Sequence, residues 1–148
     1  MICDFQIRVT GILVQDNQLL LVRQKVNPKR QWSLPGGRVD KGEKLDEAMT
    51  REILEETGIN VKVNRLLFVC DKLDSQPQIL HITFLLERVG NDEIILPTNE
   101  YDKNPISDVK YVVFTELPSY GFSKKFIDIL INGFPNTGYM GLKENIGL

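Results

Sequence analysis

One segment of the chain, residues 45–57, carries acidic side chains on the helix face that should be apolar. At about 100° per residue, its apolar side chains form a single stripe, which consists of Leu45, Ala48, Met49 and Ile53. Glu52 and Glu56 project into the middle of this stripe, and Glu55 lies at its edge. A solvated acidic face would lie opposite the stripe. Carboxylates that are taken out of water need a compensating cation, so the pattern predicts a bound divalent metal ion.

The residues before this segment predict an irregular loop. Trp32-Ser33-Leu34-Pro35-Gly36-Gly37 contains a Pro-Gly-Gly run, which favours neither a helix nor a regular strand ladder. Glycines permit close approaches that a side chain would block. Gly58 follows the acidic segment at the position where helices commonly end. We therefore expect a tight glycine loop followed by one helix over residues 45–57.

The rest of the chain predicts strands and a second helix around this core motif. Alternating apolar patterns indicate strands over residues 5–15, 18–24, 61–73, 78–88 and 109–114. The first two strands flank the turn residues Asp16-Asn17, and the third and fourth form a second hairpin. A helix is expected over 122–131 with Ser123 near its start, a long polar loop over 90–108 and a weakly specified tail over 133–148. This order predicts an α+β fold in one domain, residues 1–148.

Composition excludes several classes of function. The 148 residues carry a net charge of −2, so a basic footprint for general nucleic-acid binding is absent. Cys3 and Cys70 form no CxxC pair, which disfavours a zinc site or a disulfide framework. No apolar run approaches the roughly 18 residues of a membrane helix. With no signal segment at the N-terminus, we expect a cytoplasmic protein.

The spacing of the glycine loop and the acidic helix resembles the signature of the Nudix hydrolases at every fixed position. That signature is matched by Gly37, five residues, Glu43, seven residues, Arg51-Glu52-Ile53, one residue, Glu55-Glu56, one residue and Gly58-Ile59. The preceding WSLPG also resembles the family. The resemblance implies an α/β/α sandwich with a mixed central sheet. It also implies metal-dependent hydrolysis of a nucleoside diphosphate that is linked to another moiety.

The resemblance further implies roles for individual residues. The expected metal ligands are Glu52, Glu55, Glu56 and the backbone carbonyl of Gly36. Their hard oxygen atoms suit Mg²⁺, with Mn²⁺ as an alternative. Arg51 lies one turn from Glu47 and Glu55, so it can hold a carboxylate in orientation, although a surface ion pair with Glu47 is the simpler alternative. Glu43 is expected to be either a supporting carboxylate or one that contacts the metal ion.

The general base is less well defined by the sequence. A carboxylate must take the proton from the attacking water. Relatives use either a glutamate of the signature, for which Glu52 and Glu55 are the candidates, or an acid in the loop before the last strand. In this chain that loop offers Glu93, Glu100 and Asp108. We select Glu100 because it is central in the segment.

Substrate contacts are predicted outside the signature. Arg23 is a candidate for a phosphate contact, with solvent exposure as the alternative. Trp32 is a candidate for stacking on a base, with packing as the alternative. His81 is expected to be a structural histidine whose hydrogen bonds are made within the protein.

The substrate class stays open at this stage. Nucleoside triphosphates, ADP-ribose, other nucleotide sugars, dinucleoside polyphosphates and capped RNA are all substrates within the family. A small-molecule nucleotide is the expected partner, since the chain lacks a basic surface for RNA. A homodimer is possible. The alternative function is a non-catalytic nucleotide sensor on the same fold.

Overall fold

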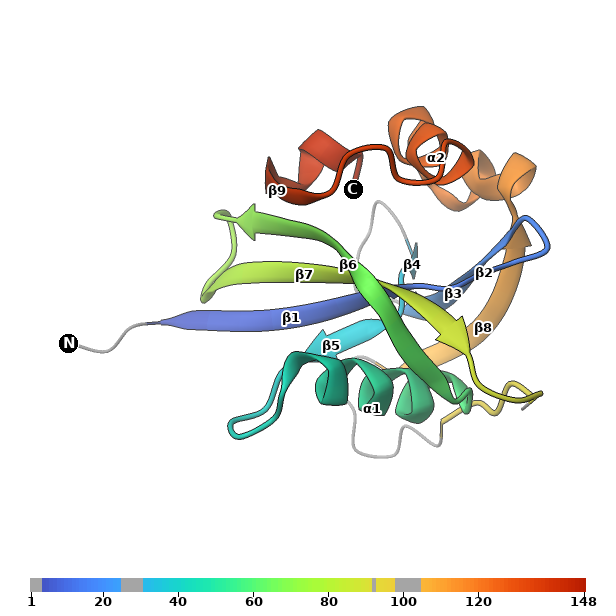
Figure 1. The fold of residues 1–148 in the computed structure, drawn as a ribbon, viewed down its shortest axis with the longest axis horizontal. Coiled ribbons are helices and arrows are strands. Elements are labelled where there is room, and N and C mark those ends of the chain that lie inside the picture. Colours follow the sequence, from blue (N-terminus) through green and yellow to red (C-terminus); the bar gives the residue numbers. More distant parts are fainter. Residues whose placement is uncertain (1–3, 25–30, 92, 98–104) are drawn as a thin grey trace.

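A computed structural model describes residues 4–24, 31–91, 93–97 and 105–148 (Figure 1). Five strands form one sheet in the order β5-β1-β7-β6-β9. Their bounds are Gly36–Arg38, Phe5–Ile12, Gln78–Arg88, Val61–Lys72 and Gly138–Leu142. The second sheet has the order β2-β3-β4, and β8 pairs with β3. These strands span Val14–Gln15, Gln18–Gln24, Trp32–Ser33 and Ile106–Val113.

Helices cover the five-stranded sheet from both sides. Figure 1 shows α1 (Leu45–Thr57) on one side, with α2 (Lys124–Ile131) and the C-terminal segment on the other. Two 3₁₀ helices, η1 (Phe114–Tyr120) and η2 (Lys143–Ile146), complete the described elements. The sheet is mixed, because β1 pairs parallel with β7 while β6 pairs antiparallel with it. The predicted α+β class with a mixed sheet is confirmed.

Each side of the sheet has its own hydrophobic core. Ala48, Met49 and Ile53 of α1 pack with buried strand residues that include Val9 and Phe84. The other core contains Phe126 and Leu130 of α2 together with Ile12 and Phe68. Alternate residues of a strand point to opposite faces, which is why β1 contributes Val9 to one core and Ile12 to the other. No helix in the described ranges is both long and apolar enough to cross a membrane.

Several predicted elements are confirmed with nearly the same bounds. The helix over 45–57, the strand over 18–24 and the hairpin of 61–73 with 78–88 all form. The second helix begins at Lys124, because the Ser123 side chain accepts a hydrogen bond from the backbone N–H of Phe126 (3.2 Å) and caps it.

Other predictions are wrong. Residues 5–15 form two strands, since β1 and β2 belong to different sheets and therefore do not make one simple hairpin arm. Gly36 and Gly37, expected in an irregular loop, pair with Thr10 and Val9 as part of β5. The polar loop ends earlier than residue 108, because β8 begins at Ile106. The tail over 133–148 contains β9, which pairs parallel with β6.

Candidate functional site

Helix α1 presents its acids at three different depths. Gly58 ends the helix in the left-handed conformation (φ 76°), where its N–H donates to the carbonyl of Leu54. Glu56 is buried with 9% of its surface exposed. The Glu52 side chain is 15% exposed, whereas that of Glu55 is 59% exposed. This gradation follows the helical positions read from the sequence, in which Glu52 and Glu56 share the apolar stripe and Glu55 lies at its edge.

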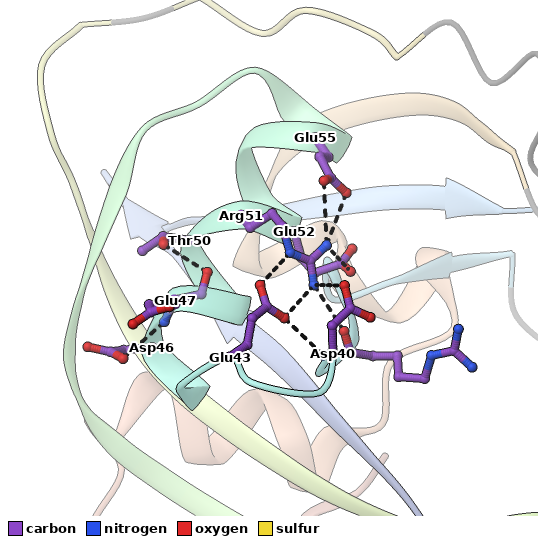
Figure 2. Close-up of polar contacts among 9 residues, drawn as sticks. Asp40, Glu43, Asp46, Glu47, Thr50, Arg51, Glu52 and Glu55 are labelled. Carbon is purple, nitrogen blue, oxygen red and sulfur yellow. Dashed lines mark hydrogen bonds and ion pairs between the residues drawn. The ribbon is translucent and has the colours of Figure 1, made fainter.

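Arg51 is the centre of a charged network that joins α1 to the loop before it (Figure 2). Its Nε donates to Oε2 of Glu43 at 2.6 Å, and its Nη2 donates to Oε1 of the same carboxylate at 2.9 Å. Its Nη1 donates to Oε1 of Glu52 at 2.9 Å and more weakly to Glu55 at 3.3 Å. Asp40 lies 3.5 Å from Nη2. Such a two-point contact between an arginine and a carboxylate is stronger than a neutral hydrogen bond, and it also fixes the orientation of the two side chains.

The network departs from the sequence prediction in two partners. Glu47, offered as a surface partner of Arg51, instead lies 3.5 Å from Lys44 with both side chains largely exposed. Glu43 is the main partner of Arg51, which the spacing of the signature did not indicate. Asp40 was not singled out by the sequence at all, because one acid in a polar loop gives no signal before the loop is folded.

The two glycines of β5 lie directly against two of the acids. The backbone N–H of Gly36 donates to Oε1 of Glu56 at 2.8 Å. A Cβ at Gly37 would lie 2.3 Å from Cδ of Glu52. A Cβ at Gly36 would lie 2.1 Å from the carbonyl oxygen of Val9 on the paired strand. The absence of a side chain at Gly37 therefore lets the Glu52 carboxylate approach β5, and its absence at Gly36 lets β5 approach β1.

Burial and the arginine set the proton affinity of these acids. Hydrogen bonds from Arg51 lower the pKa of Glu43 to about 2. The carboxylate of Glu43 in turn raises the pKa of Arg51. Loss of hydration raises the pKa of Glu52, and it raises the pKa of Glu56 to about 8, although the Gly36 N–H opposes the shift. A cation bound nearby would favour the ionised form of the buried Glu56 and so lower its raised pKa.

The donor chemistry of this site fits a divalent metal ion. Carboxylate and carbonyl oxygens are the ligands that Mg²⁺ prefers. Among the residues that the structure describes, however, no three acidic, histidine or cysteine side chains stand together as a metal-binding group. Arg51 donates hydrogen bonds to Glu52 and Glu55, whereas Glu56 accepts one from Gly36 of β5. A bound cation would therefore share the carboxylates of Glu52 and Glu55 with Arg51.

A pocket opens beside the acidic face. Its lining includes Gly36 and Glu56 at one end and Arg8, His81 and Lys143 further along. The empty volume is about 560 Å³ with its open mouth included. Sequence reasoning missed Arg8 and Lys143, because only the pairing of distant strands brings them to one place. The pocket supplies room for a ligand next to the acids.

Arg23 and Trp32 do not line this pocket, although the residues that follow them, Gln24 and Ser33, do. Nε and Nη2 of Arg23 both donate to Oε1 of Gln31 at 2.9 and 2.7 Å. Trp32 packs edge-on against Tyr120 with ring centroids 5.2 Å apart, and Nζ of Lys110 lies 5.2 Å from the centroid of the indole. These contacts correspond to the packing alternative for Trp32. The substrate contacts predicted for Arg23 and Trp32 stay predictions.

The three acids proposed as a general base in the loop over 90–108 do not all lie in that loop. Asp108 lies within β8, where its carboxylate accepts the N–H of Val109 at 2.8 Å, so it is not a loop residue. Glu93 is exposed in the segment 93–97. The N–H of Ile95 in this segment donates to the carbonyl of Thr57 at the end of α1 (2.8 Å). Glu100 lies outside the described residues.

A mixed sheet between helices, with a glycine strand set against an acidic helix face, defines a domain of the Nudix type. The NUDIX domain family matches residues 4–129. The chain therefore belongs to the Nudix hydrolase family, whose members generally use divalent metal ions.

Individual relatives agree with this assignment. An ADP-ribose pyrophosphatase of Methanocaldococcus jannaschii is 43% identical over 89 residues, which are 58% of this chain and 53% of the relative. A putative 8-oxo-dGTP diphosphatase of Bacillus subtilis is 53% identical over 53 residues, 36% of this chain and 34% of the relative. The chain thus spans about half or less of the length of these relatives.

Solved structures show the same fold. A UDP-X diphosphatase superposes with a TM-score of 0.67 at 26% identity, covering 90% of this chain and 66% of the other. An ADP-ribose pyrophosphatase from Streptococcus suis superposes with a TM-score of 0.69 over 90% of this chain and 98% of the other, at 19% identity. The second similarity concerns the fold alone.

Proposed function

We propose that this protein is a metal-dependent hydrolase that cleaves a phosphoanhydride bond in a nucleoside diphosphate linked to another moiety. The observation that carries the proposal is the complete signature folded as one unit, with buried Glu56 facing both the glycine strand and the pocket. A bound Mg²⁺ or Mn²⁺ would neutralise phosphate oxygens and lower the pKa of an attacking water. The names of the relatives support the same class of reaction.

The residues of the chain have separate tasks in this proposal. Glu52, Glu55, Glu56 and the carbonyl of Gly36 would hold the cation. Arg51 would keep Glu52 and Glu55 in orientation while itself fixed by Glu43, which accepts from it at 2.6 and 2.9 Å. The proton of the attacking water would pass to a carboxylate. Glu52 and Glu55 are the candidates in the signature, and Glu100 remains the candidate in the loop.

The substrate is proposed to be a small nucleotide. ADP-ribose is the first compound to test, because the relative with 43% identity over 89 residues is named an ADP-ribose pyrophosphatase. 8-oxo-dGTP is the second, from the name of the Bacillus subtilis relative. A homodimer and a cytoplasmic location remain predictions from the sequence.

Replacement of Glu56 by Gln tests the proposal. Purified wild type and Glu56→Gln are incubated with Mg²⁺ and a panel that contains ADP-ribose, UDP-glucose and 8-oxo-dGTP, and both products are identified. We expect hydrolysis by the wild type and a loss of about 100-fold in the variant, because substitutions around a metal site commonly cost about 10- to 100-fold in activity. Glu47→Gln, an exposed acid of the same helix, is the matched control.

The sensor alternative predicts a different result from the same panel. A non-catalytic protein would bind one of these nucleotides and release no product, with or without Mg²⁺ and Mn²⁺. Binding without turnover by the wild type would therefore reject the proposed hydrolase. Loss of activity in Glu47→Gln equal to that in Glu56→Gln would reject the assignment of the site.

A further inference from the structure

The pocket beside the acids crosses the face of the five-stranded sheet. Gly36 lies on the edge strand β5, Arg8 and Thr10 lie on the adjacent β1, and His81 lies on β7. Lys143 directly follows β9, which is the strand at the opposite edge of the sheet from β5. The lining therefore changes from an acidic end at Glu56 and Gly36 to a basic end. Arg8 is the first cation beyond the acids.

Arg8 and His81 are neighbours by strand register. The two residues are paired directly between the parallel strands β1 and β7. His81 is likewise opposite Cys70 of β6. Side chains in directly opposed positions lie on the same face of a sheet. Arg8 and His81 thus project together into the pocket, on the side away from the α1 core.

The Arg8 guanidinium is partly buried and yet has no hydrogen bond or ion pair to the described residues. It lies close enough to Glu52 and Glu56 to favour their ionised forms. A guanidinium offers a planar fork of donors that matches a phosphate group. In the described part of the chain this fork remains available to a ligand.

His81 adds an unpaired polar group to the same wall. The residue is 7% exposed, and its Nδ1 has no hydrogen-bond partner within the described residues. Buried polar atoms are nearly always paired, so this atom contradicts the expectation of a histidine with all its hydrogen bonds made. Burial, together with the charges of Lys143, Arg8 and Lys72, lowers the pKa of His81 to about 3. The imidazole is therefore neutral at pH 7.

We propose that Arg8 and Lys143 form a second anion site in this pocket, which binds a phosphate of the substrate that lies outside the metal-held diphosphate. The inference rests on the proposed function for its link to a substrate, but the site itself can bind phosphate without metal. It assigns the substrate to nucleotides with an additional phosphate. That phosphate is carried either on the ribose or at the end of a polyphosphate chain.

Binding of nucleotide to metal-free protein tests the anion site directly. AMP and adenosine are titrated by calorimetry into wild type, Arg8→Gln, Lys143→Gln and the control Lys124→Gln, all in excess chelator. Lys124 is an exposed lysine at the start of α2. AMP should bind the wild type more tightly than adenosine does, and each pocket variant should weaken AMP at least tenfold. Equal affinity for AMP and adenosine, or equal AMP affinities in Arg8→Gln and Lys124→Gln, would overturn the site.

Kinetics with Mg²⁺ then identify the source of the phosphate. The ratio of kcat/KM for ADP-ribose 2′-phosphate over ADP-ribose tests a ribose phosphate, and that for dGTP over dGDP tests the end of a chain. One ratio should exceed ten in the wild type and fall toward one in Arg8→Gln. If both ratios are near one, the additional phosphate is rejected while the hydrolase stands. If nothing is hydrolysed, the proposed function fails, and the metal-free titrations still decide the anion site.

Discussion

Arg51 and Glu43 form a two-point charged contact, with Nε to Oε2 at 2.6 Å and Nη2 to Oε1 at 2.9 Å. This contact joins the first part of the signature to its helix. The remaining Nη1 of Arg51 is directed to Glu52 and Glu55. Glu43 therefore acts on the acidic face through Arg51, without lying on the helix itself.

Arg51→Lys is expected to lower kcat by about 10- to 100-fold, the range that is typical for partners of metal ligands. A lysine carries the charge but not the fork, so it cannot hold Glu43 and Glu52 together. The half-maximal Mg²⁺ concentration should rise as well, which a loss of stability alone would not produce. Lys44→Gln removes an exposed cation nearby and should change neither value. Wild-type kcat and Mg²⁺ dependence in Arg51→Lys would contradict the role of the contact.

The two glycines of β5 should respond differently to alanine. In Gly37→Ala the new Cβ meets the end of the Glu52 side chain, which can rotate away. We expect a change in stability within about 1 kcal/mol and a loss of activity of at least tenfold. In Gly36→Ala the Cβ meets the backbone of Val9 at 2.1 Å, so the paired strands must separate. That variant should lose about 2 kcal/mol or more in urea unfolding.

The comparison of the two variants makes this prediction specific. Full activity of Gly37→Ala would show that Glu52 need not lie against the strand. A Gly36→Ala protein as stable as the wild type would show that β1 and β5 can separate without loss. Activity is measured on the best substrate of the panel, and stability by the midpoint and slope of the unfolding curve.

The acidic helix was predictable because its signal is local. The stripe of Ala48, Met49 and Ile53, the acids among them and the terminal Gly58 all lie within 14 residues of sequence, 45–58. Helical geometry alone places Glu52 and Glu56 on the buried side. The sequence likewise placed Ser123 near the start of a second helix, and the structure shows that Ser123 is the N-cap of α2.

The pocket could not be predicted because its residues meet only through long-range pairing. Arg8 and His81 are 73 positions apart and become neighbours when β1 and β7 pair in parallel. β9 was missed because Gly138 and Gly141, both at positive φ, interrupt the alternating pattern of a strand. β5 was missed for a related reason, since a Pro-Gly-Gly run reads as a turn until the close approach to Val9 is known.

Removal of the Glu56 charge should stabilise the metal-free protein at alkaline pH. The pKa of Glu56 is raised from 4.5 to about 8 in the folded chain. Below pH 4.5 the carboxyl is protonated in both states. Between these values the unfolded chain releases the proton while the folded chain keeps it, so the free energy of unfolding falls as pH rises. Glu56→Gln abolishes this fall and should gain on the order of 5 kcal/mol at about pH 9.

Thermal melts in chelator and in Mg²⁺ check the cause. Mg²⁺ should raise the Tm of the wild type at about pH 8 by binding the folded state, and it should have little effect on Glu56→Gln. Glu47→Gln, exposed on the same helix, should follow the wild type at every pH. A wild-type Tm that is flat from pH 5 to about 9 in chelator would contradict the buried carboxyl.

His81 should produce the opposite dependence in acid. Its pKa is lowered from 6.5 to about 3, chiefly by burial and further by the charges of Lys143, Arg8 and Lys72. Above pH 6.5 the imidazole is neutral in both states. As pH falls below that value, the unfolded chain takes up a proton that the folded chain refuses, so the free energy of unfolding falls. Urea unfolding between pH 7 and about 4 should show that His81→Gln removes on the order of 3 kcal/mol of this loss. Parallel curves for the two proteins would mean that the imidazole is protonated normally and therefore is not buried without a partner.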